Sequence, residues 1–265
     1  MKRLFIIVFL LSWYFPFPSQ IPLLAQENND DIISRLEDKS HPTSQEAAIR
    51  SIIANPKAYK PVLLAYLKKK RNLDNKAERP SEAVLYTIGF TRDKDYFPYL
   101  FGLLKTNYAK DQCIYYCGVV FAAILTCPDI KYISNKNDSA PLHDFSYNLK
   151  KFLTTKANGS LSKRRKEAFK YLPVYSDGEI RDKEFLDYPI KKLLEIAKYE
   201  VVDFERWVTA ATVLEYLGES LDTATDLLII AIQGPGDESD EVKGACHEGI
   251  LNILVRNKKN HLAGK

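Results

Sequence analysis

The residue types that most often carry chemistry do not form a catalytic pattern in this chain. The four histidines are scattered and no HExxH segment occurs, which excludes the helix of a zinc protease. Neighbouring residues on a helix point about 100° apart, so His247 and Cys246 are not expected to share a metal ion. No GxSxG segment or phosphate-binding glycine loop is present either. We therefore predict no catalytic residue, no metal site and no cofactor.

Three of the four cysteines fall on one helical stripe. Cys113, Cys117 and Cys127 alternate with Val120 and Ile124 at steps of 4, 3, 4 and 3 residues, which is the spacing of one helix face. Buried thiols on such a face serve as small hydrophobic side chains. The alternative, in an exported chain, is a disulfide between Cys113 and Cys117 or between Cys127 and a neighbouring helix. Cysteine spacing does not decide between these readings.

The first 25 residues have the order of parts of a secretory signal peptide. Lys2 and Arg3 precede the uncharged, largely apolar residues 4–25, and Ala25 offers a small residue for cleavage before a polar stretch. We expect an exported protein, periplasmic or extracellular. The alternative is a membrane anchor formed by residues 4–25, because a spanning helix needs about 20 apolar residues. Three prolines in this stretch disfavour a regular helix.

The composition indicates a folded soluble protein and makes nucleic acid a poor partner. Hydrophobic residues are 46% and charged residues 27% of the 265 residues, as in ordinary globular chains. The formal net charge is only +4, whereas nucleic-acid binding calls for a concentrated basic face. The longest basic run in the second half, residues 163–166, begins a predicted helix.

The elements that position these residues are helices that recur at a nearly constant interval. Six apolar anchors follow one another at steps of 36, 36, 48, 42 and 36 residues: Ile52, Ile88, Ile124, Leu172, Leu214 and Ile250. A second small or apolar residue precedes each anchor by four positions, so the two share one helix face. This period is typical of stacked helix pairs. We predict one domain over residues 43–256, after a flexible lead-in at 26–42 and before a tail at 257–265, with insertions near 128–160 and 174–187.

Two segments of the C-terminal third resemble the HEAT-repeat family, in its short bacterial form. Asp240 to Ala245 is similar to the family's acidic-Val-Arg-x-x-Ala helix opening, with Lys243 in place of arginine, and Thr209 to Gly218 resembles its Ala-rich middle and Leu-Gly finish. The resemblance implies an all-α, right-handed superhelix of about six helix pairs and a role as a protein-binding scaffold or adaptor. Some short HEAT-like proteins resemble lyases that act on tetrapyrrole adducts, which is the alternative function, although no matching catalytic motif occurs here. A membrane-tethered adaptor is the third reading.

In solenoids of this family the second helix of each pair lines the concave side. Residues two and nine positions before each anchor point away from the anchor's face. We predict that a polar protein partner lies along this lane, whereas the alternative is a set of merely solvated positions. The predicted lane residues are Arg50, Arg79, Tyr86, Tyr115, Lys163, Lys170, Glu205, Glu241 and Glu248.

Overall fold

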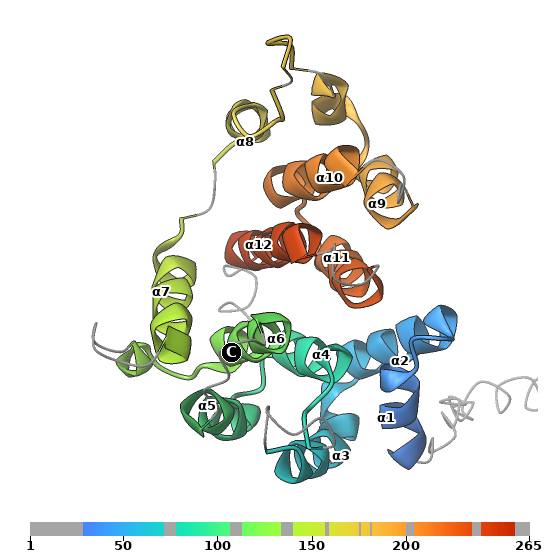
Figure 1. Cartoon of the computed structure of the whole chain (residues 1–265), viewed down its shortest axis with the longest axis vertical. Coiled ribbons are helices and arrows are strands. Elements are labelled where there is room, and N and C mark those ends of the chain that lie inside the picture. The colour runs from blue at the N-terminus through green and yellow to red at the C-terminus, as the bar shows by residue number, and fades with distance from the viewer. Residues whose placement is uncertain are drawn as a thin grey trace, which may run out of the picture.

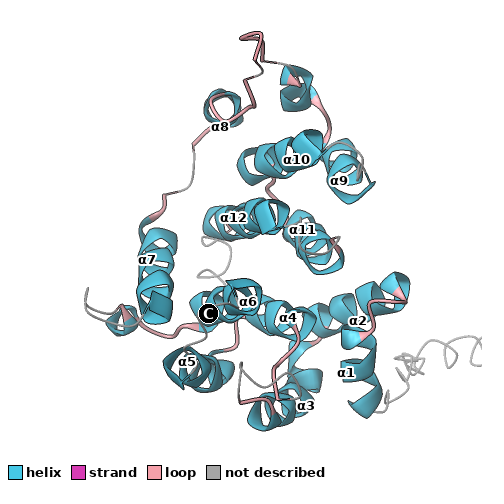
Figure 2. Cartoon of the chain, viewed as in Figure 1, coloured by secondary structure: helices cyan, strands magenta, loops and turns pink. Residues whose placement is uncertain are grey.

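The described part of the chain is helical throughout its regular structure. A computed structural model describes residues 29–71, 78–106, 113–133, 140–156, 159–174, 176–180, 182–199, 204–234 and 240–257. Within these ranges α-helices and short 3-10 helices are found and no strand (Figure 2), which confirms the all-α class. The predicted signal segment lies outside the described residues. In the described ranges no helix combines the length and the apolar character required to cross a membrane.

The first group of helices covers the N-terminal half (Figure 1). Its members are α1 (Asn29–Glu37), α2 (Pro42–Ala54), α3 (Pro56–Lys69), α4 (Glu82–Thr91), η1 (Lys94–Tyr96), α5 (Phe97–Thr106), α6 (Cys113–Thr126), η2 (Ile130–Tyr132) and α7 (Ala140–Thr154). Prolines at the first position open α2 and α3, where a missing N–H costs nothing. The Ser81 hydroxyl caps α4 by accepting a hydrogen bond from the Val84 N–H at 3.4 Å.

The second group begins after α7 and turns back toward the first. It consists of α8 (Leu161–Phe169), η3 (Lys183–Asp187), α9 (Ile190–Tyr199), α10 (Phe204–Leu217), α11 (Leu221–Gln233) and α12 (Asp240–Arg256). Serine hydroxyls cap two of these helices, since Ser160 accepts from the Lys163 N–H and Ser220 accepts from the Thr223 N–H.

The predicted anchors are confirmed as core residues. All six are at most 4% exposed, and they fall on α2, α4, α6, the turn after α8, α10 and α12. The residues four positions earlier are buried as well. Helices α2, α4, α6, α10 and α12 therefore turn the expected face inward, as the i, i+4 spacing predicts, and Leu172 reaches the core from the turn after α8.

Close approach of α4 and α6 depends on a glycine. A Cβ added to Gly89 would lie 2.8 Å from the Ala122 Cα atom, which is closer than two carbon atoms pack. Gly89 and Ala122 therefore allow the two backbones to come together in the middle of the N-terminal group.

The chain closes on itself in a way that the repeat pattern did not predict. In an open array each pair contacts only its neighbours in sequence. Here α11 packs on α2 and α4, and α12 packs on α7, so the last pair lies between the N-terminal group and α9–α10 (Figure 1). One connected hydrophobic core runs from Ile32 to Leu254. We call the contact of α11–α12 with α2, α4, α6 and α7 the junction.

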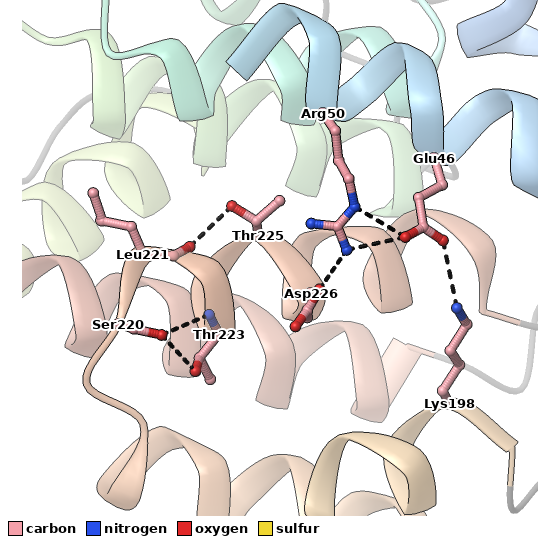
Figure 3. A network of polar contacts seen from close by, with 8 residues as sticks. All are labelled: Glu46, Arg50, Lys198, Ser220, Leu221, Thr223, Thr225 and Asp226. Atoms are coloured by element: carbon pink, nitrogen blue, oxygen red, sulfur yellow. Dashed lines mark hydrogen bonds and ion pairs between the residues drawn. The ribbon is translucent and has the colours of Figure 1, made fainter. Parts of the chain in front are cut away.

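Polar side chains span the edge of the junction. Arg50 on α2 donates to Asp226 on α11 at 2.6 Å and to Glu46 on its own helix, while Lys198 on α9 reaches Glu46 at 3.5 Å (Figure 3). These groups are partly exposed, so each pair stabilises the fold by only a fraction of a kcal/mol to about 1 kcal/mol. They fix the orientation of α11 against α2 more than they add to stability.

Candidate functional site

The fold leaves an open groove between α7, α8, α10 and α12, with a volume of about 650 Å³. We call this space the groove. Its lining mixes acids, lysines, amides and aromatic rings, including Lys151, Lys163, Glu215, Tyr216, Glu248 and Asn252. Four separate helices supply these side chains, so the groove exists only because α12 folds back beside α7.

Glu215 lies on the wall of the groove and is only partly exposed. It follows the buried anchor Leu214 on α10, and its Oε1 atom accepts a hydrogen bond from the Asn252 amide on α12 at 2.7 Å. Burial, and then the negative charge of Glu248, raise the pKa of Glu215 to about 7. Lys151 and Arg256 act in the opposite direction but do not outweigh these effects. Glu215 can therefore exchange a proton near neutral pH.

Lys151 and Glu248 form an ion pair across the groove, from α7 to α12. The Lys151 Nζ atom donates to Glu248 Oε1 at 2.9 Å. Burial lowers the pKa of Lys151, but the hydrogen bond and charge of Glu248 outweigh it and raise that pKa overall. This pair links α7 to α12.

Two stacked tyrosines form the aromatic part of the groove. The rings of Tyr171 and Tyr216 lie 5.6 Å apart between centroids and are inclined by 17°. Tyr171 is 62% exposed, so one ring face is available to a ligand. A stacked aromatic pair of this kind offers a rigid apolar surface beside polar groups.

The basic run at residues 163–166 divides its side chains among three environments. Lys163 lines the groove. Arg164 is buried and donates to the Tyr216 carbonyl at 3.2 Å and to the Glu219 carboxylate. Arg165 lies 3.6 Å from the Asp187 carboxylate. The run therefore holds α8 against α10 and η3 and presents only part of its charge to a ligand.

The structure separates the predicted lane into two environments. Lys163 and Glu248 line the groove together. Lys170 lies nearby on the exposed face of α8 and pairs with Glu167 at 3.1 Å, and Glu205 is exposed in the first turn of α10.

The early part of the lane is buried at Tyr86, which corrects the expectation of an accessible surface for that residue. Tyr86 is fully buried, and its ring packs on Phe121 and His247. The physical reason for this burial is the junction, because α11 and α12 cover the face that an open array would leave to a partner. Arg50 stays exposed at the edge of the junction, where it pairs with Asp226 within the chain. Arg79 is half-buried before α4. The side chains of Tyr115 and Glu241 lie outside the described residues.

The prediction that the thiols are buried is also corrected at one position. Cys246 is buried, and burial raises the pKa of its thiol to about 12, so it behaves as a small hydrophobic side chain as expected. Cys117, by contrast, is exposed. Cys127 is half-buried, with its thiol 3.3 Å from the Asp129 carbonyl. The side chain of Cys113 lies outside the described residues, so its predicted pairing stays a prediction.

A second, smaller cavity of about 330 Å³ lies between α2, α9, α10 and α11. Trp207 and Ile230 supply an apolar wall, and Gln233 crosses the space between the groups by donating to the Pro42 carbonyl at 2.8 Å. Because Gln233, Lys198 and the Gln45 Nε2 atom bind other parts of the chain, we assign this cavity to the junction. Within the described residues, no group of three or more His, Cys, Asp or Glu side chains is placed to hold a metal ion.

Sequence reasoning missed most of the groove residues, among them Lys151, Tyr171, Glu215 and Tyr216. The available signal was a glutamate inside an apolar helix, because Glu215 stands between Leu214 and Tyr216 in an otherwise hydrophobic run. A carboxylate in such a position is either paired or functional.

Comparisons of the chain with protein-family models, with curated proteins and with solved structures gave no match.

Proposed function

We propose that the protein binds another protein and that a segment of that partner lies in the groove. The observation that carries the proposal is the lining of this 650 Å³ space, where the exposed ring of Tyr171 lies among side chains of both charges. Tyrosine is enriched at the centre of protein interfaces because it offers a large rigid surface and a polar group. A mixed, open lining of this kind suits a polypeptide better than a small apolar ligand.

The distribution of exposed hydrophobic side chains favours the same region. Among the described residues, six of the eight large hydrophobic side chains that are exposed lie on α7, on α8 and just after α8: Tyr147, Leu153, Leu161, Phe169, Tyr171 and Val174. Exposed apolar side chains that gather in one region are typical of interaction sites. Tyr147 lies one helical turn before Lys151, so it flanks the groove on α7.

The wider proposal is an exported scaffold or adaptor built from HEAT-like helix pairs. The six buried anchors and the two C-terminal segments that resemble HEAT repeats support the repeat architecture. The basic start and apolar stretch of residues 1–25 support export, with cleavage after Ala25. The mass of the mature protein tests this step, because a retained segment would make the protein a membrane-tethered adaptor instead.

Site-specific crosslinking tests the binding site. A photoreactive benzoylphenylalanine is placed at Tyr171, at Tyr147, or at the exposed Lys57. Lys57 belongs to α3, a helix that lies far from α8 (Figure 1). The proposal predicts that one protein is crosslinked from Tyr171 and Tyr147 and not from Lys57. The same set of proteins from all three positions, or none from either tyrosine, contradicts it.

A further inference from the structure

We infer that the groove receives an arginine or lysine side chain of the bound polypeptide, and that Glu215 is the carboxylate that pairs with it. This inference rests on the proposed function and specifies the chemistry of the partner. Its basis is charge complementarity between the half-buried Glu215 carboxylate and a cationic side chain of the partner.

Glu215 is only half satisfied within the chain. Its Oε1 atom accepts from the Asn252 amide at 2.7 Å. In the part of the chain that the structure describes, its Oε2 atom accepts no hydrogen bond, and no lysine or arginine forms an ion pair with this carboxylate. Because Glu215 also lines the groove, a donor that enters the groove can reach it.

The cations nearest to Glu215 are engaged elsewhere. On α7, Lys151 pairs with Glu248 at 2.9 Å. On α12, Arg256 donates through Nη2 to the backbone carbonyls of Glu215 and Gly218, both at 2.6 Å. Its positive charge lowers the pKa of Glu215, but its hydrogen bonds go to backbone carbonyls and not to the Glu215 carboxylate. Buried Arg164 is held by Glu219.

The remaining charged groups that line the groove do not pair with the Glu215 carboxylate either. Glu248 on α12 and Glu167 on α8 add negative charge to the lining, while Lys163 on α8 and Lys156 just after α7 are exposed cations at the rim. A guanidinium or ammonium group placed at Glu215 would supply the cation that this carboxylate lacks. Charge-assisted hydrogen bonds of this type are the stronger ones in proteins.

The neighbouring rings fit the rest of such a side chain. Tyr216 follows Glu215 on α10, and its ring stacks on that of Tyr171. The aliphatic stem of an arginine or lysine packs along aromatic surfaces while its charged end reaches a polar group. Tyr171 and Glu215 therefore offer a surface and a charge to the same side chain.

Binding of a cation favours the ionised form of Glu215 and so releases a proton. The affinity should therefore depend on pH in a direction that can be predicted. The raised pKa of Glu215, about 7, means that the carboxyl is largely neutral at pH 6 and largely ionised at pH 8. A cation binds the ionised form. Affinity is therefore expected to fall about tenfold from pH 8 to pH 6.

The test uses the full-length folded protein and two capped peptides. The ¹³C resonance of the Glu215 carboxyl is followed through a pH titration, alone, with Ac-Gly-Arg-Gly-NH₂, or with Ac-Gly-Gln-Gly-NH₂ as the neutral control. The inference predicts that the arginine peptide moves the midpoint to lower pH and that the glutamine peptide does not. An unchanged midpoint with both peptides, or an equal change with both, overturns it.

Two variants separate this site from other carboxylates. Glu215→Gln should bind the arginine peptide at least about tenfold more weakly at pH 8 and lose the pH dependence, whereas Glu205→Gln, an exposed change on the same helix, should leave both unchanged. Equal effects of the two variants would overturn the inference.

Spermidine distinguishes a free polyamine from a peptide, because a response to spermidine alone would exclude the peptide as occupant. Failure here with successful crosslinking at Tyr171 would leave the proposed function in place.

Discussion

His247 of α12 lies face to face with Phe121 of α6, with ring centroids 4.9 Å apart and planes inclined by 26°. Tyr86 of α4 packs against both rings, at 4.9 Å from His247 and 5.5 Å from Phe121. A helix of the last pair thus shares one aromatic cluster with α4 and α6, from which a simple array would keep it apart. This cluster, together with the ion pairs at the edge of the junction, explains why the C-terminal pair occupies the predicted partner face.

Removing the His247 ring should destabilise the protein. His247→Ala takes away two aromatic contacts and leaves a cavity at the junction, so we expect a loss of about 2 to 3 kcal/mol in the free energy of unfolding. Urea denaturation followed by circular dichroism measures this change. His143→Ala is the control, because His143 is exposed and its removal should change stability by less than about 0.5 kcal/mol. Equal effects of the two variants would show that the cluster does not hold the groups together.

Acid should weaken the junction through the same residue. Burial, and then the charge of Lys243, lower the pKa of His247 from 6.5 to about 3. Below about pH 6.5 the unfolded chain takes up a proton that folded His247 does not, so stability falls with falling pH by up to about 1.4 kcal/mol per unit.

The variant His247→Phe isolates this effect, because it keeps a ring in the cluster and removes the titrating group. Urea denaturation of both proteins at pH 6.5 and at pH 4.5 gives the comparison. The native protein should lose more stability than the variant over this interval. An identical loss would mean that His247 is accessible to protons in the folded state.

A buried ion pair offers a second test of the junction. Lys243 of α12 lies 3.3 Å from Glu82 of α4, and both side chains are largely buried. Lys243→Met leaves the Glu82 carboxylate without its partner and should cost about 3 to 5 kcal/mol. The double change Glu82→Leu with Lys243→Met should recover most of this loss, because no buried charge remains. A double-mutant cycle by urea denaturation measures the coupling, and additive effects would contradict the contact.

Gly89 should tolerate no side chain. The Cβ atom of Gly89→Ala would lie 2.8 Å from the Ala122 Cα atom, so α4 and α6 must separate, at a cost of about 1 to 3 kcal/mol. Gly244→Ala is the matched control in α12, where an added Cβ meets nothing within 4 Å. There alanine should stabilise the helix by up to about 1 kcal/mol. Thermal denaturation should therefore shift in opposite directions for the two variants.

The helices and their buried faces could be predicted because they depend on local spacing. Ile52, Ile88 and Ile250 each share a face with a residue four positions earlier, and burial of one face of an amphipathic helix follows from that period alone. Lys163 and Glu248 were assigned to one lane by the same geometry, and both line the groove.

The closure could not be predicted because it depends on contacts between distant segments. Nothing in the local sequence of Tyr86 indicates that α12 will cover it, since an aromatic residue on the outer face of a helix suits a partner protein and a second part of the same chain equally well. Glu215 was missed for a related reason, because its environment comes from Asn252, Glu248 and Lys151 on two other helices.

The contact between His247 and Phe121 tests the central claim most directly, because the closure both covers the N-terminal face and creates the groove. Nuclear Overhauser effects between the two rings can be measured in a sample with selectively labelled histidine and phenylalanine. With ring centroids 4.9 Å apart, the closed arrangement predicts clear cross-peaks from the His247 ring protons to Phe121, which disappear in His247→Ala. Absence of these cross-peaks in the folded native protein would contradict the closure and, with it, the groove.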